Sequence, residues 1–229
     1  MPTTDHCQLT TCTACPRLAA FLAESRSKFP SYFCRPVPAF GDASPRLMIV
    51  GLAPGLHGAN RTGRPFTGDF AGELLYRTLH EFGYASRPVS VSADDGLALA
   101  GCRISNAVKC VPPANKPETA EIRRCNAWLR AELTALPTTT AILALGLIAH
   151  QAVLMALDLK RTAHPFAHGA RHVIAAKAAP AHPSPLGGGA GEREMRLYDS
   201  YHCSRYNTQT RRLTPAMFRA VFARIQQET

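Results

Sequence analysis

Residue types able to bind and react lie close together between Gly51 and Phe70, in the segment GLAPGLHGANRTGRPFTGDF. The segment follows the short apolar run 47–50 and precedes a helical pattern, so it joins a strand to a helix. Sites in α/β sheets form beyond the carboxyl ends of strands. Its five glycines let the backbone approach a ligand, while Phe66, Asp69 and the basic residues offer stacking, proton transfer and charge. We interpret the segment as a functional loop, against the alternative of an ordinary long surface loop.

A second group consists of four cysteines, two close together and two distant: Cys12, Cys15, Cys110 and Cys125. Such a set can close a tetrahedral thiolate site, and both zinc and a 4Fe–4S cluster fit it. The alternative is a scatter of inert buried thiols. The first residues do not resemble a secretory signal, so we expect metal ligation rather than disulfides. Cys7 is near enough to replace a ligand, whereas Cys34, Cys102 and Cys203 are left over.

A third group follows the last expected strand, in the segment YHCSRYNTQT that begins at Tyr201. His202, Ser204 and Arg205 stand within one turn of chain, an arrangement suited to holding a phosphate and stabilising an anion. The segment 182–184 (His-Pro-Ser) looks similar but lies in a low-complexity stretch with no strand before it. We therefore exclude it from the site.

The elements that must position these groups alternate between strand and helix patterns. We expect strands at 47–50, 102–108, 141–145 and 196–201, and helices at 16–27, 70–82, 117–133, 147–157 and 215–226. This alternation predicts one three-layer α/β/α domain with a mainly parallel central sheet. The Ala/Pro/Gly-rich stretch 175–194 is interpreted as a flexible excursion from that domain.

The charge balance indicates the kind of partner. Against 26 Lys and Arg residues there are 16 Asp and Glu, a net charge of +10, and the stretch 201–227 contains five arginines and no acidic residue. Such a surface suits a polyanion such as nucleic acid, although basic surfaces also serve solubility alone. No run of 18 apolar residues is present, so we expect no membrane span. We expect a cytoplasmic, nucleoid-associated monomer.

Taken together, the segments GLAPGLHGANRTGRPFTGDF, ISNAVKCVPPANKP and YHCSRYNTQT and the four-cysteine set resemble the uracil-DNA glycosylase superfamily. The resemblance is closest to its iron–sulfur branch, family 5 or UDGb, and runs from about Cys12 to the final helix without the stretch 175–194. It implies an enzyme that flips a deaminated base out of DNA and hydrolyses its N-glycosidic bond. It also favours a 4Fe–4S cluster over zinc at the four cysteines, with a structural role.

The resemblance assigns the residues that handle the base. Phe66 is expected to stack on it, and Asn106 to read its edge, because a side-chain amide offers both a donor and an acceptor. Gly51 and Gly55 would let the backbone approach the base or a phosphate. For Asn106 the alternative role is capping a turn.

The expected catalytic groups follow from a departure at Ala53, where other glycosylase families carry an Asp or Asn that handles water. Asp69 is the nearest carboxylate and is expected to activate water, with Asn115 as a second polar partner; Asp69 also suits the N-cap of the 70–82 helix. His202 would stabilise negative charge on the departing base. Ser204 would hold a flanking phosphate, and Arg205 with Tyr206 would fill the gap left by the flipped base.

The methyl group at Ala53 predicts a permissive pocket, so hypoxanthine and other deaminated bases are expected substrates beside uracil. Two alternatives remain from the residues. One is a non-catalytic iron–sulfur DNA-binding module of the same fold. The other is a zinc-stabilised phosphate-ester hydrolase, for which the sequence offers no recognisable carboxylate/His cluster.

Overall fold

A six-stranded sheet forms the centre of the protein, which a computed structural model describes over residues 8–137, 139–177 and 192–228. The strand order is β1-β3-β2-β4-β6-β5. The inner strands are parallel, whereas both edge strands pair antiparallel. In chain order the strands are β1 (Phe40–Gly41), β2 (Leu47–Gly51), β3 (Cys102–Asn106), β4 (Ala141–Leu145), β5 (Arg171–Lys177) and β6 (Glu192–Ser200).

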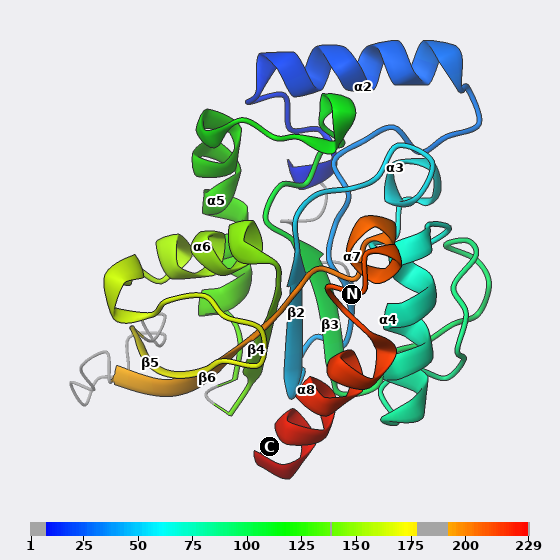
Figure 1. Ribbon diagram of the computed structural model, residues 1–229. Coiled ribbons are helices and arrows are strands. Elements are labelled where there is room, and N and C mark those ends of the chain that lie inside the picture. Colours follow the sequence, from blue (N-terminus) through cyan, green and yellow to red (C-terminus); the bar gives the residue numbers. More distant parts are fainter. Residues whose placement is uncertain (1–7, 138, 178–191, 229) are drawn as a thin grey trace, which may run out of the picture.

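Helices cover both faces of this sheet (Figure 1). Successive side chains of a strand point to opposite faces, so Leu47 and Ile49 join one apolar cluster while Met48 and Val50 join the other. Helices α4 (Phe70–Glu81) and α8 (Pro215–Glu228) pack on the first face, and α5 (Thr119–Thr134) and α6 (Leu147–Ala156) on the second. The predicted three-layer α/β/α sandwich is confirmed.

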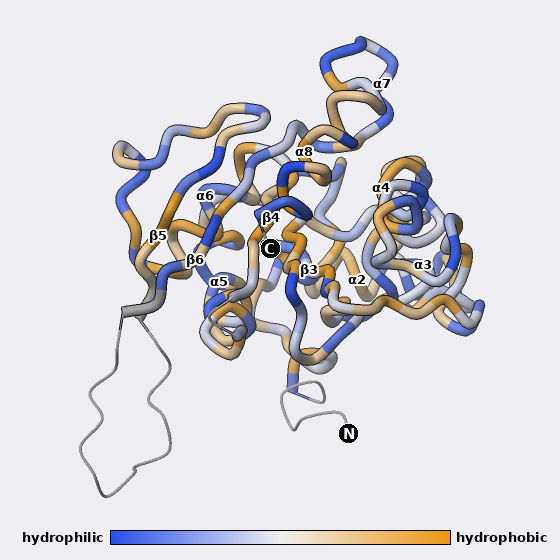
Figure 2. The backbone as a smooth tube through the Cα atoms, turned by 90° about the horizontal axis from the view of Figure 1, so that it is seen from below, coloured by the Kyte–Doolittle hydropathy of each residue, from blue (hydrophilic) through white to orange (hydrophobic). Residues whose placement is uncertain are grey.

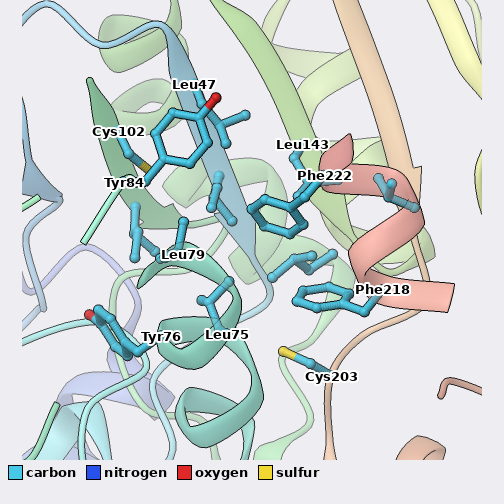
Figure 3. Close-up of a cluster of buried hydrophobic side chains, with 14 of the residues drawn as sticks. Leu47, Leu75, Tyr76, Leu79, Tyr84, Cys102, Leu143, Cys203, Phe218 and Phe222 are labelled. Atoms are coloured by element: carbon cyan, nitrogen blue, oxygen red, sulfur yellow. The ribbon is translucent and has the colours of Figure 1, made fainter. Parts of the chain in front are cut away.

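The first of these clusters reaches the edge of the sheet where the site lies. Figure 3 shows side chains from α4 and α8 meeting those of the strands, with Cys203 at one end of the group. Cys203 is fully buried. Because Cys203 points into this core, its neighbours along the chain are free to face the site.

A further helix, α2 (Pro16–Lys28), lies across one end of the sandwich (Figure 1). Its buried Leu18 and Leu22 pack with Val108 and Val111 and with the thiols of the downstream cysteines. The helix begins with proline at its first position, where the missing N–H costs nothing. The N-terminal arm is thus attached to the domain at the cysteines.

Several boundaries differ from those expected. The strands β1 and β5 were not predicted, β3 ends at Asn106 rather than at 108, and β6 begins at Glu192. Both ends of the predicted excursion 175–194 therefore belong to paired strands, because β5 and β6 form a ladder from Arg171↔Tyr198 to Lys177↔Glu192. Only Val173 and Ile174 in β5 favour a strand locally, so its pairing with β6 decides its full extent. The remainder of the excursion, with its His-Pro-Ser segment, lies outside the described residues, as does Cys7.

The register of the sheet brings the carboxyl ends of its strands to one edge. Gly51 of β2 pairs with Asn106 of β3, and Leu145 of β4 pairs with Ser200 of β6. The loops that leave these strands contain the short elements α3 (Ala59–Thr62), η1 (Pro113–Asn115) and α7 (Arg205–Gln209). A 3-10 turn, η2 (Arg161–Ala163), precedes β5. No helix among the described residues is long and apolar enough to span a bilayer.

Candidate active site

A cavity of about 440 Å³ opens at this edge of the sheet. The residues that the sequence assigned to the base, its flanking phosphate or the reaction line it, with the exceptions of Gly51 and Tyr206: Ala53, Gly55, Phe66, Asp69, Asn106, Asn115, His202, Ser204 and Arg205. Leu52, Pro54, Ala59, Phe70 and Ala71 complete the wall and were not predicted. They flank predicted residues on the same loop, which is the only signal that could have found them.

The floor of the cavity is formed by the ends of β2 and β3. Asn106 is 3% exposed, and its Oδ1 atom has no hydrogen-bond partner among the described residues. A Cβ atom added at Gly51 would lie 2.4 Å from this oxygen and 2.6 Å from the ring of Phe66. Gly51 therefore lies under the cavity and leaves room for both side chains. An unpaired buried acceptor is costly and calls for a donor from a ligand.

Phe66 presents its ring to the cavity from an unusual backbone conformation, with φ at 53°. Non-glycine residues rarely adopt positive φ, and such strain is found at functional sites when the surroundings hold it. The hydroxyl of Tyr76 donates to the Pro65 carbonyl at 2.9 Å. Gly72 of α4 lies directly against the Phe66 carbonyl, where a Cβ atom would be only 1.9 Å away. The helix and its tyrosine thus fix the direction of the aromatic ring.

Asp69 is the N-cap that its position predicted, and it also lines the cavity. Its Oδ1 accepts a hydrogen bond from the Gly72 N–H at 2.9 Å, which makes it the N-cap of α4. Its other carboxylate oxygen faces Gly55 and Gly58, and a Cβ atom at Gly58 would lie 2.4 Å from it. Burial raises the pKa of the Asp69 carboxyl, against the opposing effect of the N–H groups of α4. A carboxylate with a raised pKa is a better proton acceptor.

His202 lies opposite Phe66. The two rings are 5.9 Å apart between centroids and tilted by 28°, so they border the same part of the cavity. Protein surrounds the imidazole except where it meets the cavity, and this burial lowers the pKa of His202 to about 4. The ring is therefore neutral at pH 7 and has one N–H to donate. The Asn207 side chain holds the backbone at this point by donating to the His202 carbonyl at 2.8 Å.

The remaining predicted residues form the rim. Ser204 caps α7 by accepting from the Asn207 N–H at 3.4 Å, and the guanidinium of Arg205 lies 5.1 Å above the ring of Phe70. Tyr206 is 70% exposed, and α7 lies at the periphery of the molecule in Figure 2. Asn115 is exposed on the opposite rim. These side chains are positioned to contact a polymeric ligand that lies across the mouth of the cavity.

The four predicted cysteines line a separate cavity, the cysteine cavity, together with Lys109, Arg124 and Trp128. Burial raises the pKa of Cys125 to about 11, although the nearby Lys109 opposes this. The Lys109 backbone N–H donates to the Cys125 sulfur at 3.3 Å. Interactions with the thiols of Cys12, Cys15 and Cys125 add to the burial that raises the pKa of Cys110, so the four side chains lie near one another. The left-over cysteines Cys34, Cys102 and Cys203 are buried elsewhere.

A histidine–aspartate group that the sequence did not reveal lies on the other side of β6. Asp199, fully buried, accepts from His150 Nδ1 at 2.7 Å and from His172 Nε2 at 3.2 Å, and His150 Nε2 meets the His164 carbonyl at 2.9 Å. The ligand atoms of these three side chains are within 4.8 Å of one another. They satisfy one another and do not line the base cavity. The group therefore does not support a metal-dependent hydrolase at that cavity.

Comparison with known proteins agrees with this arrangement. Residues 38–226 match the family model described as the uracil DNA glycosylase superfamily. This chain belongs to the uracil-DNA glycosylase superfamily. The superfamily match extends from the segment before β1 into α8 and so includes the whole cavity.

Individual relatives in the superfamily match nearly the full chain. A type-5 uracil-DNA glycosylase of Thermus thermophilus is 46% identical over 92% of this chain and 90% of its own length. Type-5 enzymes of Pyrobaculum aerophilum and Mycobacterium leprae are each 42% identical, over 90% and 95% of this chain and 84% and 91% of their own lengths. A type-4 enzyme of Pyrobaculum aerophilum is 35% identical over 52% of this chain and 53% of its own length.

Proposed function

We propose that this protein is a DNA-repair glycosylase that flips uracil out of DNA and hydrolyses its N-glycosidic bond, leaving an abasic site. The observation that carries the proposal is the unpaired Asn106 oxygen at the bottom of a cavity bordered by Phe66 and His202. A uracil edge offers an N–H beside a carbonyl oxygen. The Asn106 amide accepts from the first through Oδ1 and donates to the second through Nδ2.

The remaining contacts orient the flipped base. The face of the base lies against Phe66, and Ala53 adds a methyl group to the wall. Because no polar side chain at Ala53 reads or excludes part of the base, hypoxanthine and related deaminated bases are substrates as well. Ser204 and Arg205 on the rim hold the phosphates that flank the flipped nucleotide, and Arg205 with Tyr206 fills the space the base leaves.

The bond between the sugar C1′ and the base nitrogen breaks with its electron pair leaving on the base. Negative charge then builds on a base oxygen, and the neutral His202 imidazole donates its N–H to that oxygen. A donor placed for developing charge contributes about 3 kcal/mol. An oxocarbenium-like sugar remains, and water attacks C1′ from the side of Asp69, which accepts the proton. Asn115 on the rim helps to position that water.

The cysteine cavity is the site of a 4Fe–4S cluster in this proposal, with Cys12, Cys15, Cys110 and Cys125 as ligands. Four cysteine thiolates can hold either a zinc ion or a 4Fe–4S cluster, and the resemblance to the iron–sulfur branch favours the cluster. When bound, the cluster supplies a covalent link between the N-terminal arm and α5. Hydrolysis needs no electron transfer, so we assign it a structural role.

The testing experiment uses the brown, cluster-loaded monomer and oligonucleotides that carry one uracil or one hypoxanthine. After incubation, alkali cleaves the strand wherever a base has been removed. Cleavage at uracil is the expected result, and cleavage at hypoxanthine extends the base range. DNA binding without cleavage at either base would instead indicate the non-catalytic iron–sulfur module.

A further inference from the structure

A second open cavity of about 580 Å³ adjoins the base cavity. The two share Gly55, Asp69, Phe70, Asn115 and Arg205, so Asp69 stands in the wall between them. The proposed function gives this second cavity no task. One of its walls, which the base cavity lacks, is formed by Val89, Ser90 and Val91 in the connection between α4 and β3.

Two valines of that connection are unusually exposed. Val89 and Val91 are 56% and 58% exposed, whereas Ser90 between them is 9% exposed. Both valines line the second cavity. Large apolar side chains exposed beside a binding cavity mark a contact surface more often than isolated surface residues do.

Hydrogen bonds and an ion pair hold this connection against the loop that carries Phe66 and Asp69. Arg64, 4% exposed, donates to the Ser90 hydroxyl at 3.0 Å and to the Asp95 carboxylate at 2.7 Å. The Gly68 N–H donates to the Ser90 carbonyl at 3.3 Å, and Asp95 accepts from the Val91 N–H at 2.8 Å. Asp95 is itself nearly buried, and its bonds hold the pKa of that carboxyl well below its usual range. The fold thus presents the two valines from a rigid support joined to the loop that carries Phe66 and Asp69.

The charges of the cavity decide what it can receive. The carboxylates of Asp69 and Glu73 both line it, and they repel a phosphate at that end. Arg205, the shared basic residue, stands at the border with the base cavity. The interior therefore suits an uncharged, flat group that can lie on valine methyls and donate N–H bonds to carboxylates. In DNA that group is a nucleobase, while the connecting phosphate stays near Arg205.

We infer that the second cavity binds the base next to the uracil in the same strand, with its face against Val89 and Val91. This inference rests on the proposed function, since it requires a uracil-containing strand in the first cavity. The connection 86–98 then determines how the cleavage rate depends on the base next to uracil. Purines offer more surface than pyrimidines, so a neighbouring purine gains more from the valines.

The test is a double-mutant cycle in single-turnover cleavage of single-stranded oligonucleotides. The substrates carry one uracil and either an ordinary purine or a tetrahydrofuran abasic residue as its 5′ or its 3′ neighbour. Wild-type protein should lose about tenfold in rate when the neighbouring base is removed on one side, the effect expected from about 55 Å² of buried apolar surface. The V89S/V91S double variant should lose less than twofold on the same change.

The matched control is V173S. Val173 is 48% exposed on the edge strand β5 and lines neither cavity. It should retain the wild-type response to the missing base. Thermal unfolding of V89S/V91S checks that its fold is intact.

An equal response of wild type and double variant to base removal would overturn the inference, as would a wild type indifferent to both neighbours. In either case uracil cleavage itself would leave the proposed function standing. Absence of cleavage by wild type on every substrate would instead remove the proposed function.

Discussion

The Asp69 carboxylate begins helix α4 by accepting the Gly72 N–H at 2.9 Å while its second oxygen faces the glycine loop of the base cavity. One side chain thus supports both the fold and the proposed chemistry. Gly72 has two roles as well, since it donates this bond and leaves room for the Phe66 carbonyl. The aromatic face and the carboxylate are fixed by the same turn of helix.

Asp69→Asn should separate these roles. Asparagine caps helices as well as aspartate does, and it removes a carboxylate whose pKa burial has raised. The thermal midpoint should therefore be equal or higher, while single-turnover cleavage falls at least about 100-fold, the size of a general base. Asp69→Ala should lose the same activity and should also be about 1 kcal/mol less stable, because α4 loses its N-cap. Equal loss of DNA binding and cleavage in the asparagine variant would contradict the role of Asp69 with water.

The pH dependence of stability should reveal the buried His202. Its folded pKa of about 4 lies below the ordinary 6.5, so the unfolded chain takes up a proton first as the pH falls. His202 has no effect on stability above about pH 6.5, and below it the native state loses up to about 3 kcal/mol by pH 4. Urea unfolding should show a steeper loss between pH 6.5 and 4.5 in wild type than in His202→Gln. Parallel curves would show that the imidazole titrates normally.

The pH profile of cleavage should follow Asp69 rather than His202. Activity needs ionised Asp69, whose pKa is raised, so the rate should fall on the acid side as this carboxyl takes up a proton. Because His202 stays neutral over this range, the pH–rate profile should show no second inflection near pH 6.5. Nitrogen NMR of labelled histidine should show a neutral His202 ring from pH 7.5 to below 6, and an imidazolium signal at pH 7 would refute the assignment.

Gly51→Ala should block the cavity floor. The new methyl group would overlap Asn106 Oδ1 and the Phe66 ring, at 2.4 and 2.6 Å, and both must move from the position that receives the base. We expect at least about a tenfold loss in kcat/KM for uracil DNA with the circular dichroism spectrum unchanged. Binding of DNA that contains no uracil should persist, since the rim is not altered. If Gly51→Ala has the same kcat/KM as wild type, the bound base does not contact the floor of the cavity.

Cys125→Ser should abolish metal binding and loosen the N-terminal arm. A ligand held at about a thousand times its Kd adds about 4 kcal/mol to the native state, so unfolding should occur at clearly lower temperature. Protease digestion should release α2, whose apolar residues pack on this cavity. Cys34→Ser is the matched control, because Cys34 is buried away from the four proposed ligands. Retained iron and sulfide in Cys125→Ser would remove it from the ligand set.

The sequence was sufficient for the central layers and for most of the cavity, because both depend on local patterns. A buried strand followed by a glycine-rich loop and an N-cap aspartate locates β2, Asp69 and α4 within a few residues. The end of the expected strand 196–201 locates His202 in the same way, whereas Asn106 was assigned from the resemblance. Parallel strands then bring these ends together, so local patterns predicted a shared site.

What could not be predicted depends on contacts between distant residues. The ion pair of Arg64 with Asp95 spans 31 positions, and the His150–Asp199 bond spans 49. Neither has a spacing rule. The extent of β5 likewise depends on its pairing with β6, since Ala175 and Ala176 favour no strand by themselves. Such features follow only when the chain is already folded.

The hairpin of β5 and β6 also separates the low-complexity stretch from the edge of the sheet that carries the cavity. Lys177 and Glu192, which flank the low-complexity stretch, pair at the far end of the ladder, whereas Ser200 ends β6 beside the cavity. The two ends of that stretch are therefore anchored to each other, a full strand length from His202. Changes of length or composition there leave the geometry of the catalytic edge as it is. A fluorophore, an affinity tag or a fused domain inserted between Lys177 and Glu192 should be carried without loss of base excision.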